Sequence, residues 1–181
     1  QNISFIEECR AKLFHYPGTF DTLAGALDNK EDNVKKNALP VCLNISLATS
    51  IRKSMFDHST FIPSLMTIAK NEDGLVREKA LSIMRNVANH EDTKTPMFDF
   101  PGLIDSLMFV VKKALTAESK LARETALAVC QNIANNNINP MKLLNHPGFM
   151  MTLYDVFREE ATEMNQIARQ NALLICQNLS F

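Results

Sequence analysis

The sequence predicts an all-α fold, a solenoid of about four three-helix repeats, and three observations predict it. An apolar segment that ends on asparagine recurs along the chain, at Asn2, Asn44, Asn86, Asn132 and Asn178. The steps between these asparagines are 42, 42, 46 and 46 residues, and a fixed period of this size is typical of stacked repeats. A helix-breaking segment, with Pro-Gly in three of its four copies, also recurs once per repeat.

The repeat pattern predicts a single domain over residues 1–181. We assign residues 1–4 to the tail of a preceding repeat, and the four repeats to approximately 5–46, 47–88, 89–134 and 135–181. Each repeat begins with a short apolar stretch that suits a short helix, at 5–14, 51–56, 95–98 and 141–144. The chain opens inside the pattern and without methionine, so we expect it to be part of a longer protein.

The second helix of each repeat follows the break. Pro-Gly ends the preceding helix at residues 17–18, 101–102 and 147–148, and proline also suits the first turn of the next helix. In the second repeat, Ser59 and Thr60 are the candidate N-caps. The residues after that break fall at helical spacing on one face, at Phe61, Ile62, Leu65, Ile68 and Ala69.

The third helix carries the asparagine, and the repeats differ in length just before it. The last two repeats have four extra residues between the second-helix leucine and the third-helix alanine. Four residues are about one helical turn, so we expect lengthened helices, with a loop insertion as the alternative. Pro40 lies inside the third helix of the first repeat, where it predicts a kink or a late helix start.

Composition excludes several classes of partner. A formal net charge of -1 gives no electrostatic reason to expect a nucleic acid or an anionic membrane. No apolar run is long enough to span a bilayer, and no signal-peptide pattern opens the chain. Cys42, Cys130 and Cys176 share one slot that Met84 fills in another repeat, which indicates a buried apolar position. We therefore expect reduced thiols and a cytoplasmic or nuclear protein.

The repeat resembles the armadillo repeat family. That family's third helix commonly reads V-x-E-x-A-x-W-A-L-x-N-[IL]-[AST], and residues 76–88 match it closely except at the tryptophan. The family's glycine before the second helix corresponds to Gly18, Gly102 and Gly148, with Thr60 in the remaining repeat. The resemblance covers essentially the whole chain. It is specific for a fold and weak for a function, because proteins of one fold differ in their partners.

The resemblance implies a right-handed superhelix whose third helices line a concave groove. In peptide-binding armadillo proteins the third-helix asparagine hydrogen-bonds the main chain of an extended ligand, which an amide suits as donor and acceptor. The corresponding ladder here is Asn44, Asn86, Asn132 and Asn178. The family's groove tryptophan falls at Pro40, Ser82, Ala128 and Leu174, and the chain has no tryptophan. The resemblance therefore argues against an import-receptor function and leaves general groove binding open.

Other interpretations of these residues stand beside the groove. The asparagines could be structural, capping carbonyls or bridging neighbouring repeats. Three of them fit the N-x-[ST] glycosylation pattern, which we interpret as chance because they lie in the helical repeat. A basic residue begins each third helix and could attract an acidic segment, although inter-repeat ion pairing is the interpretation we favour. This basic row is Lys35, Arg77, Arg123 and Arg169.

The sequence predicts no enzyme, no metal and no cofactor. His15, His58 and His146 fall one to a repeat, so a solenoid would keep them apart, and no catalytic motif is present. We therefore expect a non-catalytic scaffold that binds an extended peptide segment of a protein partner in the groove. The alternative is a structural spacer in a larger solenoid, self-associating or stacking through uncapped ends.

Overall fold

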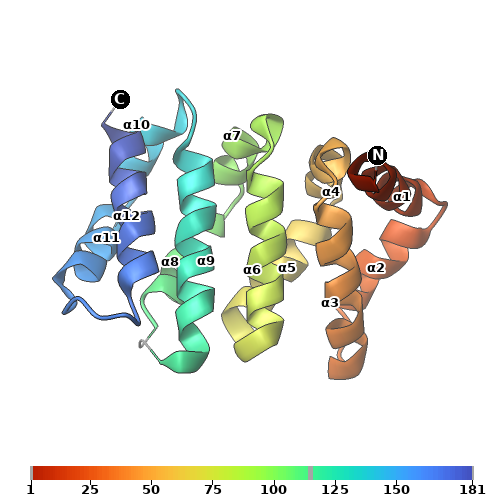
Figure 1. The fold of residues 1–181 in the computed structure, drawn as a ribbon, viewed down its shortest axis with the longest axis horizontal. Coiled ribbons are helices and arrows are strands. Elements are labelled where there is room, and N and C mark those ends of the chain that lie inside the picture. Colours follow the sequence, from red (N-terminus) through yellow and green to blue (C-terminus); the bar gives the residue numbers. More distant parts are fainter. Residues whose placement is uncertain (1, 114–115, 181) are drawn as a thin grey trace. The chain divides into compact units, whose positions relative to one another are not determined.

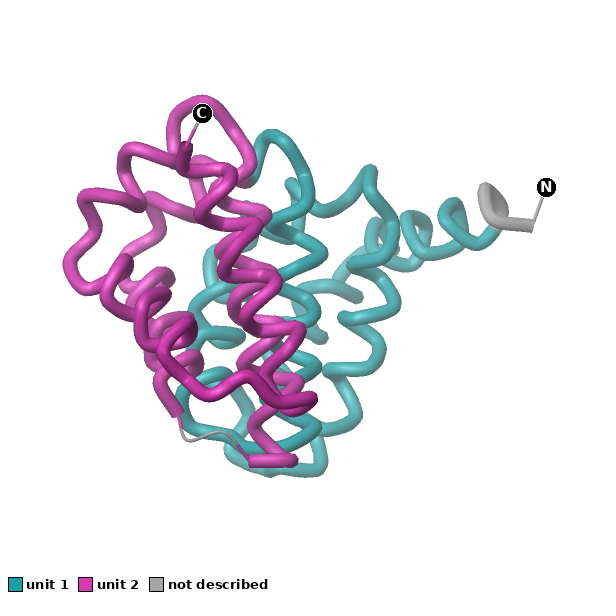
Figure 2. The backbone as a smooth tube through the Cα atoms, turned by 60° about the vertical axis from the view of Figure 1, so that its left-hand side comes forward, with its two compact units in different colours: residues 1–93 teal, residues 94–181 magenta. Residues whose placement is uncertain are grey.

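The computed structural model describes residues 2–113 and 116–180, and for residues 2–5 it describes the backbone alone. Every regular element in these residues is a helix (Figure 1), so the prediction of an all-α fold is confirmed. The chain divides into two compact units, residues 1–93 and 94–181 (Figure 2). The division lies just after the repeat boundary predicted at residue 88.

Unit 1 contains two successive sets of a first, a second and a third helix. The first set is α1 (Asn2–His15), α2 (Thr19–Leu27) and α3 (Asp32–Ser46). The second is the 3-10 turn η1 (Thr49–Ile51) with α4 (Arg52–Asp57), then α5 (Phe61–Asn71) and α6 (Gly74–Ala88). Each third helix packs on the second helix before it, and α3 also packs against α6. Helix α1 runs without a break across the boundary that we predicted after residue 4.

Unit 2 repeats the same order. Helix α7 (Glu91–Asp99) spans the division between the units and leads into α8 (Leu103–Val111) and α9 (Ala117–Ala134). The last set is α10 (Asn139–Leu144), α11 (Phe149–Arg158) and α12 (Gln166–Leu179). Helix α9 packs on α8 and α12 packs on α11, while α9 and α12 pack against each other. A short, a second and a third helix therefore recur in all four sets, as the sequence predicts.

The second helices show how the pattern builds the core. All five apolar residues predicted to share one face of α5 are buried, with relative exposures of 2% or less. Full burial of one such large side chain contributes about 1.5–3 kcal/mol, so this face is a main source of stability in unit 1. The buried residues of this face are Phe61, Ile62, Leu65, Ile68 and Ala69.

The start of the second helix depends on glycine. Gly18, Gly102 and Gly148 have φ values of 76°, 73° and 75°, and each immediately precedes the first helical residue. Proline therefore lies in the turn and not in the first helical turn as we predicted. Thr60 takes the N-cap position in the second repeat, but its side chain makes no capping hydrogen bond. A side-chain hydroxyl four residues after each N-cap bonds that residue's carbonyl, from Thr22, Ser64, Ser106 and Thr152.

The four extra residues of the last two repeats are accommodated in two different ways. In the third repeat most of them lengthen the third helix, because α9 has 18 residues, three more than the 15 of α3 and of α6. In the fourth repeat they form the loop 159–165, and the lengthened helix predicted there is wrong. Asn165 holds this loop: its Oδ1 accepts from the Thr162 N–H at 3.0 Å, and its Nδ2 donates to the Glu160 carbonyl at 2.8 Å.

Two further predictions concern single positions in the third helices. Helix α3 runs from Asp32 through Pro40, so the late helix start is wrong, while the kink stays a prediction. The shared slot of Cys42, Met84 and Cys130 is buried, which confirms its apolar character at those three positions. Cys176 in α12 is half-buried, and Cys9 in α1 is exposed.

The left-handed glycines provide a test of the helix starts. Gly148→Ala should lower the free energy of unfolding by about 1 kcal/mol, because a Cβ disfavours this backbone conformation. The midpoint of urea unfolding measures the change. Gly25→Ala is the matched control, because Gly25 lies inside α2 with open space at its Cβ position. There the same substitution should raise stability by roughly 0.5–1 kcal/mol. Equal effects at the two positions would contradict this account.

The buried thiols predict both reactivity and a pH dependence. Burial raises the pKa of Cys42 and of Cys130 to about 12. Exposed Cys9 should therefore react first with a thiol reagent at mildly alkaline pH, while Cys42 and Cys130 react only after unfolding. Between the ordinary thiol pKa and about 12 the two thiols ionise only in the unfolded chain, so stability should fall as pH rises. Reaction of all four thiols at one rate in the folded protein would refute this.

Candidate functional site

The candidate site is a strip of third-helix side chains in each unit, with Asn44 and Asn86 in unit 1 and Asn132 and Asn178 in unit 2. On α3, Lys36, Pro40 and Asn44 are four residues apart, so they share one face of the helix. The neighbouring helix α6 continues the strip in unit 1, because the two helices pack side by side (Figure 1). Helices α9 and α12 form the corresponding pair in unit 2.

Two of the four asparagines, Asn86 and Asn178, bridge neighbouring third helices. Asn86 Nδ2 donates to Ser46 Oγ of α3 at 2.8 Å, and Asn178 Nδ2 donates to the Gln131 carbonyl of α9 at 3.3 Å. Among the described residues, neither amide oxygen accepts a hydrogen bond. Each of these two amides therefore has its donor engaged by the protein and keeps an acceptor for a ligand. Asn132 is half-buried, and Asn44 is exposed.

The slot of the family's groove tryptophan holds no aromatic ring. Pro40, Ser82 and Leu174 are half-buried there, and Ala128 is buried. Aromatic rings supply large contact areas in binding sites, so their replacement by smaller side chains leaves a strip without aromatic anchors. A ligand on this strip would depend on main-chain hydrogen bonds and on whatever apolar and charged groups lie beside the asparagines.

The basic row is engaged in pairs inside each unit. Lys35 pairs with Glu72, and Arg123 pairs with Glu159. Both glutamates directly follow the second helix of the next repeat, at the ends of α5 and α11. The hydrogen bond with Glu72 raises the pKa of Lys35. This is the inter-repeat ion pairing that we favoured over attraction of an acidic ligand.

The other two members of the basic row bind the same helix ends through the backbone. Arg77 Nε donates to the Ala69 carbonyl at 2.8 Å, and Arg77 also pairs with Asp73 at 2.6 Å. One guanidinium nitrogen of Arg169 donates to the carbonyls of Phe157 and Glu159 at 2.8 and 2.7 Å. The last carbonyls of a helix lack partners within the helix, so these arginines cap α5 and α11.

A set of capping residues was missed by sequence reasoning. Each bonds a backbone carbonyl at the end of a third helix from six residues further along the chain. Arg52 Nε donates to the Ser46 carbonyl at 2.9 Å, and Asn139 Nδ2 donates to the Ile133 carbonyl at 2.7 Å. Thr93 Oγ1 donates to the Val87 carbonyl in the same way. All three capping side chains are buried. Because the three capping residues differ in type, the sequence shows no common motif. What they share is the offset of six residues between the capping side chain and the carbonyl.

A small pocket on the α3–α6 face was also missed. It has a volume of about 240 Å³ and is lined by Lys36, Leu39, Leu75, Val76 and Lys79. Leu75 is 63% exposed. On α6, Leu75, Lys79, Ser82 and Asn86 recur at helical spacing, so the pocket belongs to the asparagine strip. The sequence signal available for this pocket was the leucine at the start of the third helix, Leu75.

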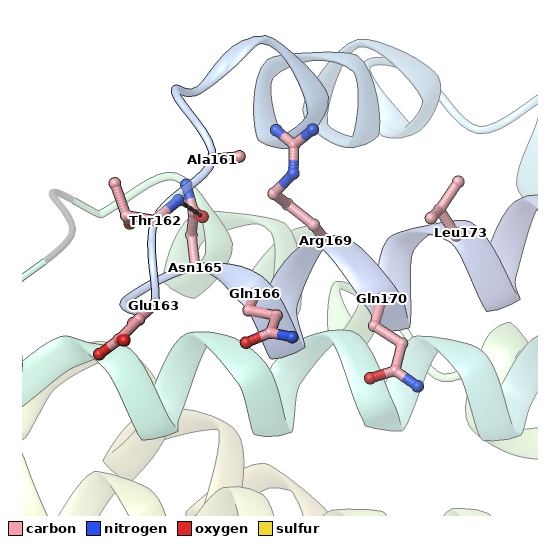
Figure 3. A pocket seen from close by; sticks show the side chains of 8 residues that line it. All are labelled: Ala161, Thr162, Glu163, Asn165, Gln166, Arg169, Gln170 and Leu173. Carbon is pink, nitrogen blue, oxygen red and sulfur yellow. Dashed lines mark hydrogen bonds between the residues drawn. The ribbon is translucent and has the colours of Figure 1, made fainter.

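A second hollow, of about 660 Å³, lies beside α12 and the loop 159–165 (Figure 3). Figure 3 shows the Arg169 side chain extending away from Gln166 and Gln170. Because the Arg169 guanidinium already caps α11, the polar side chains left to a ligand here include the amides of Gln166 and Gln170 and the carboxylate of Glu163. The amides can donate and accept hydrogen bonds, and the carboxylate can accept them.

Two of the predicted histidines each lie near an aspartate of the preceding repeat. His58 Nε2 lies 3.1 Å from Asp21 Oδ1, and His146 Nε2 lies 3.8 Å from Asp105 Oδ1.

Burial raises the pKa of the Glu124 carboxyl. Within residues 2–113 and 116–180, no group of three or more His, Cys, Asp or Glu residues could hold a metal ion. None of the described helices combines the length and the apolar character that crossing a bilayer requires.

Comparison with known proteins adds no relative. No protein-family model, no curated protein and no solved structure matches the chain.

The bridging role of Asn86 can be measured by a double-mutant cycle. Asn86→Ala and Ser46→Ala should each lower the free energy of unfolding, and together they should show a coupling of about 1 kcal/mol from the lost hydrogen bond. Asn44→Ala is the control, because Asn44 is exposed and should change stability by less than about 0.5 kcal/mol. Purely additive effects at Asn86 and Ser46 would show that the bridge contributes nothing.

Proposed function

We propose that this chain forms a right-handed armadillo-type solenoid of four three-helix repeats, at approximately 5–46, 47–88, 89–134 and 135–181. We further propose that it is a non-catalytic scaffold that binds an extended segment of a partner protein along its third helices. Two kinds of evidence support the fold: the repeated sequence pattern, and the recurrence of first, second and third helices in that order. In both units, the third helices also pack in side-by-side pairs.

One observation carries the functional proposal. The amides of Asn86 and Asn178 are held between paired third helices by their donors, while their acceptor oxygens have no partner among the described residues. An extended peptide exposes main-chain N–H groups at regular intervals and needs acceptors to replace water. An oriented amide oxygen in each unit meets this need without reading the side chains of the ligand. Specificity must then come from neighbouring groups.

The state of the cysteines supports a proposal for the cellular location. We propose a cytoplasmic or nuclear protein, because none of the four cysteines is in a disulfide and two are buried in helix-packing positions. Thiols in these positions suit compartments that keep cysteine reduced.

A structural spacer that stacks through its ends is the second candidate, and one observation favours it. Leu173 of α12 is 60% exposed, whereas its repeat equivalents Leu39, Leu81 and Leu127 are at most 1% exposed. An apolar position that is buried in three repeats and exposed in the fourth suits contact with a further helix. Such stacking would leave the asparagine strip without a role in binding.

Selection from a displayed peptide library tests groove binding. Ser82→Arg places a long charged side chain in the strip and should weaken every selected peptide by at least about tenfold, because it blocks the ligand's path. Thr67→Arg is the matched control, because Thr67 is exposed on α5 and outside the strip. Fluorescence anisotropy with the selected peptides measures both affinities.

The controls separate binding from folding. Circular dichroism must show the same helix content for both arginine variants and the parent chain. If Ser82→Arg and Thr67→Arg bind the selected peptides equally, the strip is not the binding site. If no peptide is enriched while Leu173→Glu abolishes association with another helical repeat, the spacer function is correct.

A further inference from the structure

We propose that the pocket between α3 and α6 binds one apolar side chain of the partner segment, and that acidic residues flank this side chain. We call it the α3–α6 pocket and define it by Lys36, Leu39, Leu75, Val76 and Lys79. The inference rests on the proposed groove function and adds to it the chemical class of the ligand: an extended protein segment in which an apolar residue lies between aspartates or glutamates.

The walls of the pocket favour an apolar group. Leu39 is fully buried, Val76 is half-buried, and Leu75 remains 63% exposed. A ligand side chain placed here would remove the Leu75 side chain from water and contact Leu39 and Val76, which is a favourable transfer of apolar surface. The volume of about 240 Å³ is below the roughly 300–1,000 Å³ of small-molecule sites, so it suits a single side chain.

The charge around the pocket favours acidic flanks. Lys36 and Lys79 are the two charged residues of its lining. Lys79 forms no ion pair among the described residues. The nearest carboxylate of Lys36 is Asp32, whose Oδ2 lies at 4.0 Å from Nζ, and both side chains are more than half exposed. The neighbouring Lys35 differs, because Glu72 and Asp32 both pair with it. Two incompletely paired lysines beside an apolar pocket complement a carboxylate on each side of an apolar residue.

The position of the pocket connects it to the asparagine strip. Lys79 precedes Asn86 by seven residues on α6, which corresponds to about 10 Å along the helix. An extended chain covers that distance with about three residues. The same segment can therefore place its apolar residue in the pocket and present a main-chain N–H to the Asn86 amide oxygen. This gives the ligand a spacing as well as a composition.

Synthetic peptides test the chemistry directly. The first probe is a labelled extended peptide with one leucine between aspartate and glutamate residues. The second replaces this leucine by alanine, and the third replaces the acidic residues by lysine. Fluorescence anisotropy should show that the first probe binds at least about tenfold more tightly than either of the others, with an affinity that falls as salt rises.

Variants of the pocket complete the experiment. Lys79→Glu and Leu75→Ser should each weaken the first probe by at least about fivefold, because one reverses a charge of the lining and the other removes exposed apolar surface. Lys70→Glu is the matched charge control, because Lys70 is exposed on α5 and should leave the affinity unchanged. Equal helix content and melting temperature would show that the variants remain folded.

The outcomes separate this inference from the proposed function. Binding of the lysine-rich probe as tight as the acidic one, or no effect of Lys79→Glu, would overturn the pocket assignment. If display then yields other peptides that Ser82→Arg weakens, the groove function stands with a different ligand class. If no peptide of any composition binds and Ser82→Arg has no effect, the groove function fails and the pocket assignment fails with it.

Discussion

Close packing between neighbouring third helices is the constraint on which the rest of the structure depends. Each third helix buries an alanine at the same position, and none of the four is more than 6% exposed. A small side chain at a buried position lets a packed neighbour approach the helix backbone closely, which a long side chain would prevent. The short asparagine side chain can then reach from α6 to Ser46 and from α12 to Gln131. The four alanines are Ala38, Ala80, Ala126 and Ala172.

The ends of the packed helices explain why most residues of the basic row are engaged by other groups of the protein. Packing a helix end against a neighbour removes water from carbonyls that have no partner within the helix. Arg52 and Asn139 restore those hydrogen bonds at two third helices, and Arg77 and Arg169 do so at two second helices. Most of the basic row is therefore committed to the fold. Lys36 and Lys79 are not committed in this way, and they lie beside the pocket.

Variation between the repeats falls away from the asparagine strip. The extra residues of the third repeat begin α9 with a capping box between Thr116 and Ser119, so the helix starts earlier. In the fourth repeat, buried Asn165 satisfies the loop backbone, and α12 begins only after it. Both solutions place the extra length before the third-helix alanine. The distance from that alanine to the asparagine is six residues in all four repeats.

The sequence by itself determined the helical class, the order of helices in each repeat and the apolar face of α5. These follow from local periodicity, from the Pro-Gly breaks and from the fixed period, all of which are properties of short stretches of chain. It also predicted a bridging role for the asparagines as one of three interpretations, and inter-repeat pairing for the basic row.

Only the tertiary structure decided which partners these side chains have. Lys35 reaches Glu72 and Arg123 reaches Glu159 because consecutive repeats bring together residues far apart in the sequence, and no local pattern encodes such a pair. The α3–α6 pocket has the same origin, since its lining comes from two helices. The length of the four-residue insertions likewise could not decide whether they form helix or loop, because four residues fit either a helical turn or a loop. Side-chain hydrogen bonds, from Ser119 in one case and Asn165 in the other, decided between them.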